Sequence, residues 1–193
     1  MKAMSLYQQV LGTDFALLPL PLQQFHSVEG ALVLDGWVEV GAPGSPAARW
    51  LAWCLGAPLD ARQGPIRFEL QADSAQEVWT RHFPGKVMQS RLTIAAGHVV
   101  ERLGFARLWF ELKGGPELLE MKLVRLRFLG VPCPRWLLPA VVAEESATPG
   151  RLHFRIDVID TLDNRGWAET PENSPVVIDR SKPKGKILGL DQG

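Results

Sequence analysis

The feature that most constrains the fold of this chain is a recurring alternation of apolar and polar residues between residues 66 and 159. Residues 66–71 (IRFELQ) alternate without a break, and residues 151–158 (RLHFRIDV) do the same near the other end. Successive side chains of a strand point to opposite faces of a sheet. The alternation therefore predicts strands with one face in a core and the other face in solvent.

Short turns rich in Gly, Pro and Asp separate the alternating segments, and connections this short favour antiparallel neighbours in a meander. Residues 60–65 are expected to form a loop that precedes the strand at residues 66–72. We expect strands at residues 31–40, 66–72, 77–83, 86–94, 98–103, 105–112, 117–128, 141–146, 151–160 and 165–169.

One of the expected strands changes parity in its middle. Leu119, Met121 and Leu123 share one parity, whereas Val124, Leu126 and Phe128 share the other. An extra residue at Leu123–Val124 would restore a single inward face by forming a β-bulge. Because bulges bend strands, this irregularity predicts a curved sheet.

Two helices are predicted outside the strands. Ser45 is a good N-cap and Gly56 occupies a C′ position, so residues 45–55 are expected to be helical. This helix is apolar nearly all round, so it is buried or faces a ligand, a partner or a membrane surface. Burial under the sheet is the interpretation that we favour. A shorter helix is expected between Ser5 and Gly12.

These elements predict a mainly β fold: a curved antiparallel sheet of about eight to ten strands that forms a barrel or half-barrel, packed by one or two helices. A helix-grip α+β fold is the alternative, but it needs a long C-terminal helix that the sequence does not predict. Residues 1–170 are expected to be a single domain. Residues 171–193 are polar and contain several prolines, which predicts a weakly ordered tail.

Composition narrows the functional classes. The formal net charge of the 193 residues is zero, which argues against nucleic acid as the main partner and permits self-association, for example as a homodimer. No apolar run approaches the roughly 20 residues that span a bilayer, so no integral membrane association is expected. Without a signal peptide, Cys54 and Cys133 are expected to be reduced, buried thiols in a cytoplasmic protein.

No motif for a metal or a cofactor is recognisable. The four histidines are scattered without the spacing of a metal site, so no metal is expected. No glycine-rich loop follows a strand, so a Rossmann domain and a nucleotide cofactor are not expected either.

Arginine 81 raises a question that the sequence leaves open. Trp79, Arg81 and Phe83 share one face of a strand. In the first interpretation Arg81 is buried among aromatic side chains and needs a partner, either a carboxylate such as Glu101 or Glu144 or an anionic ligand. In the second, this face of the strand is exposed and carries a ladder of cross-strand charge pairs. The surface ladder is the interpretation that we favour.

The chain contains seven tryptophans but one tyrosine, which is an unusual balance. Trp50, Trp53 and Trp136 lie in apolar segments outside the main strands. Such segments form the rim of a barrel or a lid over its mouth, or they contact a membrane surface. Core filling remains the role that we favour for each tryptophan individually.

A series of short motifs in a fixed order resembles the bacterial domain-of-unknown-function family DUF4166 over residues 6 to 169. The motifs are LYQQVLG at 6–12, FHSVEG at 25–30, QSR at 89–91, VERLG at 100–104, LGVPCP at 129–134, RLHF at 151–154 and RGW at 165–167. The resemblance implies no established activity. Some relatives carry the domain behind an NAD(P)-binding oxidoreductase domain of the saccharopine-dehydrogenase type, which implies a metabolic or lipid-related partner.

Our leading hypothesis is a non-enzymatic module that binds an apolar or amphipathic small molecule inside the curved sheet, with Arg81 or Arg91 at a carboxylate head group. The side chains expected to contact the ligand are Trp79, Arg81, Phe83, Arg91, Glu101, Arg102, Trp109, Phe128, Trp136, Glu144 and Phe154.

Two other hypotheses stay open. The chain is an accessory or interaction subunit of a separate NAD(P)-binding oxidoreductase, as the fused relatives imply. Alternatively it is a small isomerase or hydrolase that uses His26, Glu101, Arg102 and Glu144 for proton transfer and charge stabilisation.

Overall fold

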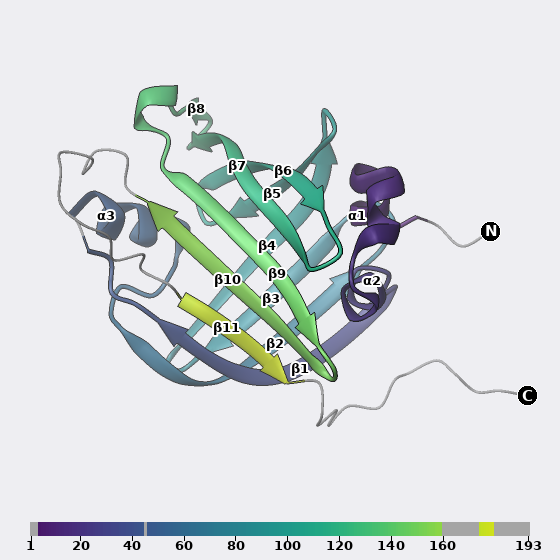
Figure 1. The fold of residues 1–193 in the computed structure, drawn as a ribbon. Coiled ribbons are helices and arrows are strands. Elements are labelled where there is room, and N and C mark those ends of the chain that lie inside the picture. Colours follow the sequence, from purple (N-terminus) through teal and green to yellow (C-terminus); the bar gives the residue numbers. More distant parts are fainter. Residues whose placement is uncertain (1–3, 45, 160–173, 180–193) are drawn as a thin grey trace, which may run out of the picture.

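The computed structural model describes residues 4–44, 46–159 and 174–179. Its strands form one antiparallel sheet that curls in the manner of a barrel or half-barrel, with a few short helices at its ends (Figure 1), which confirms the predicted fold class. The strands are β1 (Gly30–Val40), β2 (Arg62–Ala72), β3 (Glu77–Phe83), β4 (Lys86–Ala95), β5 (His98–Leu103), β6 (Ala106–Gly114), β7 (Leu118–Phe128), β8 (Val131–Pro132), β9 (Ala140–Thr148), β10 (Arg151–Ile159) and β11 (Ser174–Asp179). The helical segments are α1 (Leu6–Leu11), η1 (Gly12–Leu17), α2 (Leu20–Phe25), α3 (Pro46–Leu55) and η2 (Arg135–Leu137).

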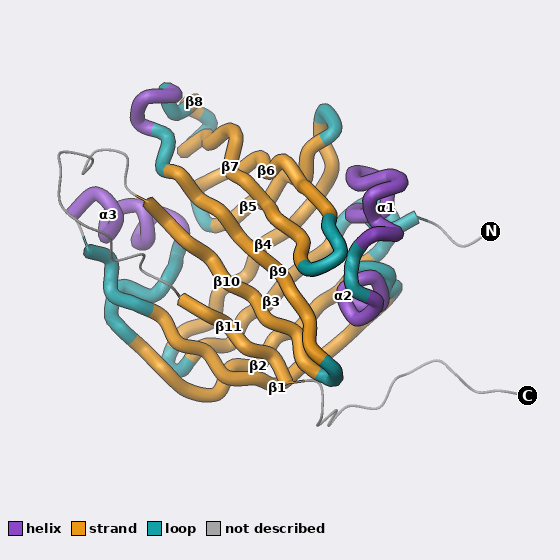
Figure 2. Tube along the Cα trace, viewed as in Figure 1, coloured by secondary structure: helices purple, strands orange, loops and turns teal. Residues whose placement is uncertain are grey.

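The strand pairings run in a closed cycle. Strands β1 to β7 pair in sequence order except that α3 separates β1 from β2 along the chain, so the predicted meander is confirmed. From β7 the cycle continues through β9, β10 and β11 back to β1, and β8 pairs only with the end of β7. The tube view in Figure 2 shows these strands following one another around the curl.

Two segments differ from the sequence prediction. Residues 62–65 belong to β2 rather than to a loop, because β1 extends to Val40 and supplies a register partner for each of them. Strand β11 was not predicted, and it lies between β1 and β10. The β11 sequence is short and begins with a serine and a proline, so it carries little strand signal of its own. Its place in the sheet therefore depends on pairing with β1 and β10. The strand predicted at 165–169 lies outside the described residues.

The predicted bulge is present in β7. Trp109 of β6 lies opposite Arg125 and Phe110 lies opposite Leu123, so Val124 is left without a direct partner. Leu123 and Leu126 are both buried as a consequence. The bulge therefore keeps one face of β7 in the core, as the parity change predicts.

The N-terminal segment covers one end of the curled sheet. Ser5 caps α1 through a capping box with Gln8, and Gly12 ends the helix. Tyr7, Leu22 and Phe25 from α1 and α2 are all fully buried in the same core as the inner face of the strands. In Figure 1 these helices lie at one end of the molecule and α3 lies at the other.

The favoured interpretation of α3 was wrong. The side chains of Trp50 and Trp53 are 56% and 62% exposed, whereas Cys54 is buried. The C-terminal end of α3 packs on the turn between β5 and β6, where a Cβ on Gly104 would lie 2.6 Å from the Cys54 carbonyl oxygen. Both indoles are therefore largely exposed to solvent, although the Trp50 ring also lies 5.3 Å from the Phe128 ring.

Both cysteines are free thiols. Cys54 is buried as predicted, but Cys133 is only half-buried. Among the described residues, no helix has the length and apolar character required to cross a membrane.

Candidate functional site

Polar side chains gather inside the curled sheet, on a face that is otherwise apolar. His26, Glu77, Ser90 and Glu145 are each at most 3% exposed. Arg81 and Glu101 face the same interior from β3 and β5. The members of this inner cluster are Tyr7, His26, Glu77, Arg81, Ser90, Glu101 and Glu145.

The closed end of the inner cluster holds a histidine–glutamate pair. His26, at the end of α2, places its Nε2 atom 2.7 Å from the Glu145 Oε2 atom in β9. The ring of Tyr7 lies 3.7 Å from the His26 ring, measured between centroids. Burial raises the pKa of the Tyr7 hydroxyl well above its ordinary value, and Glu145 raises it further, so this hydroxyl stays neutral. The His26 Nδ1 atom is buried and has no hydrogen-bond partner.

Glu77 lies next to this pair at the start of β3. The indole N–H of Trp79 donates a hydrogen bond of 2.8 Å to the Glu77 Oε2 atom. Burial raises the pKa of the Glu77 carboxyl, while His26 and the Trp79 hydrogen bond lower it and Glu145 raises it. Burial is the largest of these effects, so Glu77 holds its proton to a higher pH than an exposed glutamate does.

Within the inner cluster, Arg81 contacts Glu101 and Ser90. Its Nη2 atom lies 3.6 Å from the Glu101 Oε1 atom, and its Nη1 atom donates a 3.1 Å hydrogen bond to the Ser90 hydroxyl. The guanidinium carbon also lies 5.1 Å from the centroid of the Trp79 ring. The surface ladder favoured for this strand was therefore wrong: Trp79 belongs to the core, and parity takes Arg81 inward with it.

Aromatic rings form the wall around these groups. Phe68 lies 5.3 Å from Trp79 and 6.4 Å from Phe154, and Phe25 lies within 6.0 Å of all three, measured between ring centroids. The Phe68–Trp79, Phe25–Trp79 and Phe25–Phe154 pairs meet edge to face and the Phe68–Phe154 pair is stacked, and both arrangements are favourable. The inner face thus combines a hydrophobic wall with a compact group of ionisable side chains.

The structure brings four of the predicted ligand residues into this region: Trp79, Arg81, Glu101 and Phe154. Phe83 is buried in a separate small cluster with Val38 and Ile66. Phe128 is half-buried near the opposite end of the sheet from α1, and Trp136 is 72% exposed.

The remaining predicted residues lie on the other face of their strands. Arg91 and Arg102 are exposed on the outer face, and Trp109 is buried there beneath arginine side chains. Glu144 is half-buried on the outward parity of β9, next to the buried Glu145. Of the four residues in the enzymatic hypothesis, only His26 and Glu101 face the interior.

Sequence reasoning missed Tyr7, Glu77 and Glu145. Glu145 shares parity with Val141 and Ala143, so alternation in β9 was the signal that could have distinguished it from Glu144. Glu77 likewise shares parity with Trp79. No comparable signal identifies Tyr7, because its burial depends on where α1 packs.

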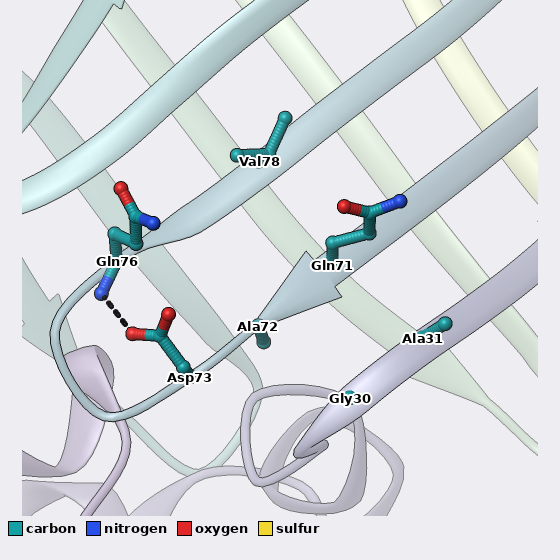
Figure 3. A pocket seen from close by; sticks show the side chains of 7 residues that line it. All are labelled: Gly30, Ala31, Gln71, Ala72, Asp73, Gln76 and Val78. Carbon is teal, nitrogen blue, oxygen red and sulfur yellow. Dashed lines mark hydrogen bonds between the residues drawn. The ribbon is translucent and has the colours of Figure 1, made fainter.

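A shallow depression of about 320 Å³ lies at the hairpin between β2 and β3, and none of the residues that line it belongs to the inner cluster (Figure 3). The Asp73 carboxylate beside it accepts hydrogen bonds from the backbone N–H groups of Ala75 and Gln76, which lower its pKa. This carboxylate is therefore occupied in holding its own turn. The residues that line the depression are Gly30, Ala31, Gln71, Ala72, Asp73, Gln76 and Val78.

Comparison with protein-family models gives a match over most of the chain. A family model described as "Domain of unknown function (DUF4166)" matches residues 18–163. No curated protein matches the chain significantly. Within the described residues, no group of three or more His, Cys, Asp or Glu side chains is placed to hold a metal ion.

Proposed function

We propose that this chain, which belongs to the DUF4166 family, binds an apolar or amphipathic small molecule inside its curled sheet. The observation that supports the proposal is the inward-facing Arg81–Glu101 pair, which is partly exposed and lies beside the aromatic side chains of a largely apolar core. A buried charge is costly unless it is paired, so a fold that needed only a packed core would gain nothing from it.

Access to this pair differs from access to the rest of the inner cluster. The side chains of Arg81 and Glu101 retain 16% and 14% of their exposure, whereas those of His26 and Glu145 retain 1% and 4%. Inward-parity apolar side chains such as Phe154 are also only half-buried. The end covered by α1 and α2 is closed, so a ligand would approach Arg81 from the opposite side.

The contacts of Arg81 suit an acidic head group. Its 3.6 Å approach to Glu101 is an ion pair without a short hydrogen bond. A carboxylate on the ligand would accept directly from the guanidinium, which is a stronger, charge-assisted interaction. The apolar part of the ligand would then lie against Phe68 and Phe154.

The test uses cis-parinaric acid, a fluorescent fatty acid, as the probe. We expect the wild-type protein to bind it, and Arg81→Met to weaken binding by about tenfold or more, because a charge-assisted hydrogen bond is lost. Glu101→Gln should strengthen binding, because it removes a carboxylate that competes for Arg81. Arg91→Met, on the outer face of the adjacent strand, is the matched control and should bind like wild type.

The opposite signs expected for Arg81→Met and Glu101→Gln separate ligand recognition from loss of folding. Binding that is absent in the wild type, or equal in all four proteins, would overturn the proposal. Native mass spectrometry of protein purified from bacteria gives an independent check, since a bound amphipathic molecule adds mass to the folded chain.

A further inference from the structure

We propose that the outer face of β4 to β7, together with the apolar turns at the adjoining end of the sheet, docks on a membrane surface that carries anionic phospholipids. The inference rests on the outside of the molecule and does not depend on a ligand in the interior. Two features carry it, a row of arginines and a group of exposed apolar side chains.

Strand register aligns arginines across four neighbouring strands. It places Arg102 of β5 between Arg91 of β4 and Arg107 of β6. It also places Arg127 of β7 opposite Arg107. These four residues and Arg125 form what we call the arginine row. Like charges directly opposite one another destabilise a sheet, so the row costs stability unless an anion neutralises it.

The row is built around one buried indole. The guanidinium carbons of Arg107, Arg125 and Arg127 lie 5.9, 5.1 and 5.7 Å from the centroid of the Trp109 ring. Trp109 is only 8% exposed beneath them, so cation–π contacts hold the guanidinium groups in place. The Arg127 Nε atom is buried without a hydrogen-bond partner.

Among the described residues, no ion pair neutralises the arginine row. Within the part of the chain that the structure describes, none of its five arginines forms an ion pair with a carboxylate. Outer-face arginines elsewhere do: Arg67 pairs with Glu69 at 3.2 Å, and Arg155 pairs with Asp157 at 3.0 Å. The row is therefore a local excess of positive charge on a chain whose net charge is zero.

Large apolar side chains project from the end of the sheet next to the row. We call this group the apolar tip: Trp50, Trp53, Phe105, Leu129, Val131 and Trp136, which are between 56% and 72% exposed. The Leu129 backbone N–H donates a 3.0 Å hydrogen bond to the Phe105 carbonyl, which joins the two turns. Trp50 packs 5.3 Å from Phe128, which brings α3 to the same end.

The arginine row lies directly behind the apolar tip. Arg102 and Arg107 flank the turn that carries Phe105, and Arg127 precedes Leu129 by two residues. In Figure 1, α3 and β8 mark this end of the molecule, away from α1 and α2. Indoles and aliphatic side chains suit the boundary between head groups and acyl chains, while guanidinium groups bind phosphate bidentately.

The chemistry of the tip favours a membrane over a nucleic acid. Bases stack on aromatic rings, but the branched aliphatic side chains of Leu129 and Val131 offer no such platform. Both are 67% exposed and are suited to hydrocarbon.

The experiment measures partition of the full chain onto vesicles. One set contains phosphatidylcholine and phosphatidylglycerol in a ratio of about two to one, and the other contains phosphatidylcholine alone. We expect salt-sensitive binding to the anionic set only. Replacing Arg102 and Arg107 together by Gln should weaken partition about 30-fold, or about 5-fold for each arginine near the surface.

Two further variants make the test specific. Arg67→Gln with Arg155→Gln removes the same charge from other parts of the outer face and should leave partition unchanged. Phe105→Asn with Leu129→Asn should weaken partition as well, because two apolar side chains no longer enter the membrane surface, and Asn tolerates the positive φ of 50° at Leu129. Urea unfolding should show the Arg102/Arg107 variant to be at least as stable as wild type, because repulsion is relieved.

Three results would overturn the proposal: no binding of the wild type to anionic vesicles, equal binding to both vesicle sets, or an equal loss in the Arg67/Arg155 control. Binding of a single-stranded oligonucleotide that depends on Arg102 and Arg107, without binding to vesicles, would assign the surface to nucleic acid instead.

Discussion

At the scale of single residues, the notable feature is that one ionisable cluster has two environments. His26 and Glu145 are sealed at the end covered by the N-terminal helices, whereas Arg81 and Glu101 are partly open to solvent. Glu77 lies with the sealed group, and burial raises the pKa of its carboxyl. Its protonation is therefore linked to the stability of the fold.

Glu77 gives a prediction for stability against pH. The raised pKa means that the folded chain holds this proton above the ordinary value of 4.5, at which the unfolded chain releases it. The contribution of Glu77 is thus fully present below that value and is lost as pH rises through the folded pKa. Relative to Glu77→Gln, the free energy of unfolding of the wild type should fall as the pH rises above about 4.5 and should level off once the pH exceeds the folded pKa.

Urea unfolding followed by tryptophan fluorescence measures this difference at each pH. Gln71→Ala, at an exposed and non-ionisable position on β2, is the control and should leave the pH dependence of the wild type unchanged. A wild-type curve parallel to that of Glu77→Gln over the whole range would contradict the assignment.

At the scale of elements, the bulge in β7 separates two functions of one strand. The residues before the bulge pair with β9. The residues after it include two arginines of the row and lead to the apolar tip. The extra residue, Val124, keeps Leu123 and Leu126 both inside while the strand bends.

Deletion of Val124 should therefore be tolerated. Without it, Leu123 and Leu126 still alternate with Arg125 between them, and the pairs with β6 are preserved, so we expect a loss of about 1 kcal/mol. Deletion of Glu69 from the regular strand β2 should cost about 2–5 kcal/mol, because Phe68 or Leu70 must leave the inner face. Equal losses in urea unfolding would show that Val124 is an ordinary ladder residue.

At the scale of the whole molecule, β11 completes the cycle of strands. It pairs with β1 at residues 35–38 and with β10 at residues 151–156. Without it, both neighbours would present unpaired backbone groups, which promote association between chains.

Truncation tests this closure. A chain that ends at residue 173 should be less stable in urea and should self-associate in size-exclusion chromatography with light scattering. A chain that ends at residue 179 keeps β11 and should resemble the full chain. Identical behaviour of the two truncated chains would mean that β11 does not contribute to closure.

The sequence by itself determined the parts of this protein that depend on neighbouring residues. Alternation located most of the strands, Ser5 and Gly12 bounded the first helix, and the parity change located the bulge. These signals are local, because strand period, capping and turn chemistry act over a few residues.

Tertiary structure decided everything that depends on register between distant strands. Alternation places Arg91, Arg102 and Arg107 outside, but only the pairing of β4, β5 and β6 aligns them in a row. The capture of β11 between β1 and β10 is equally non-local. Alternation in the sequence predicts which face of the sheet each side chain occupies. Its neighbours on the adjacent strands are determined only when the strands pair.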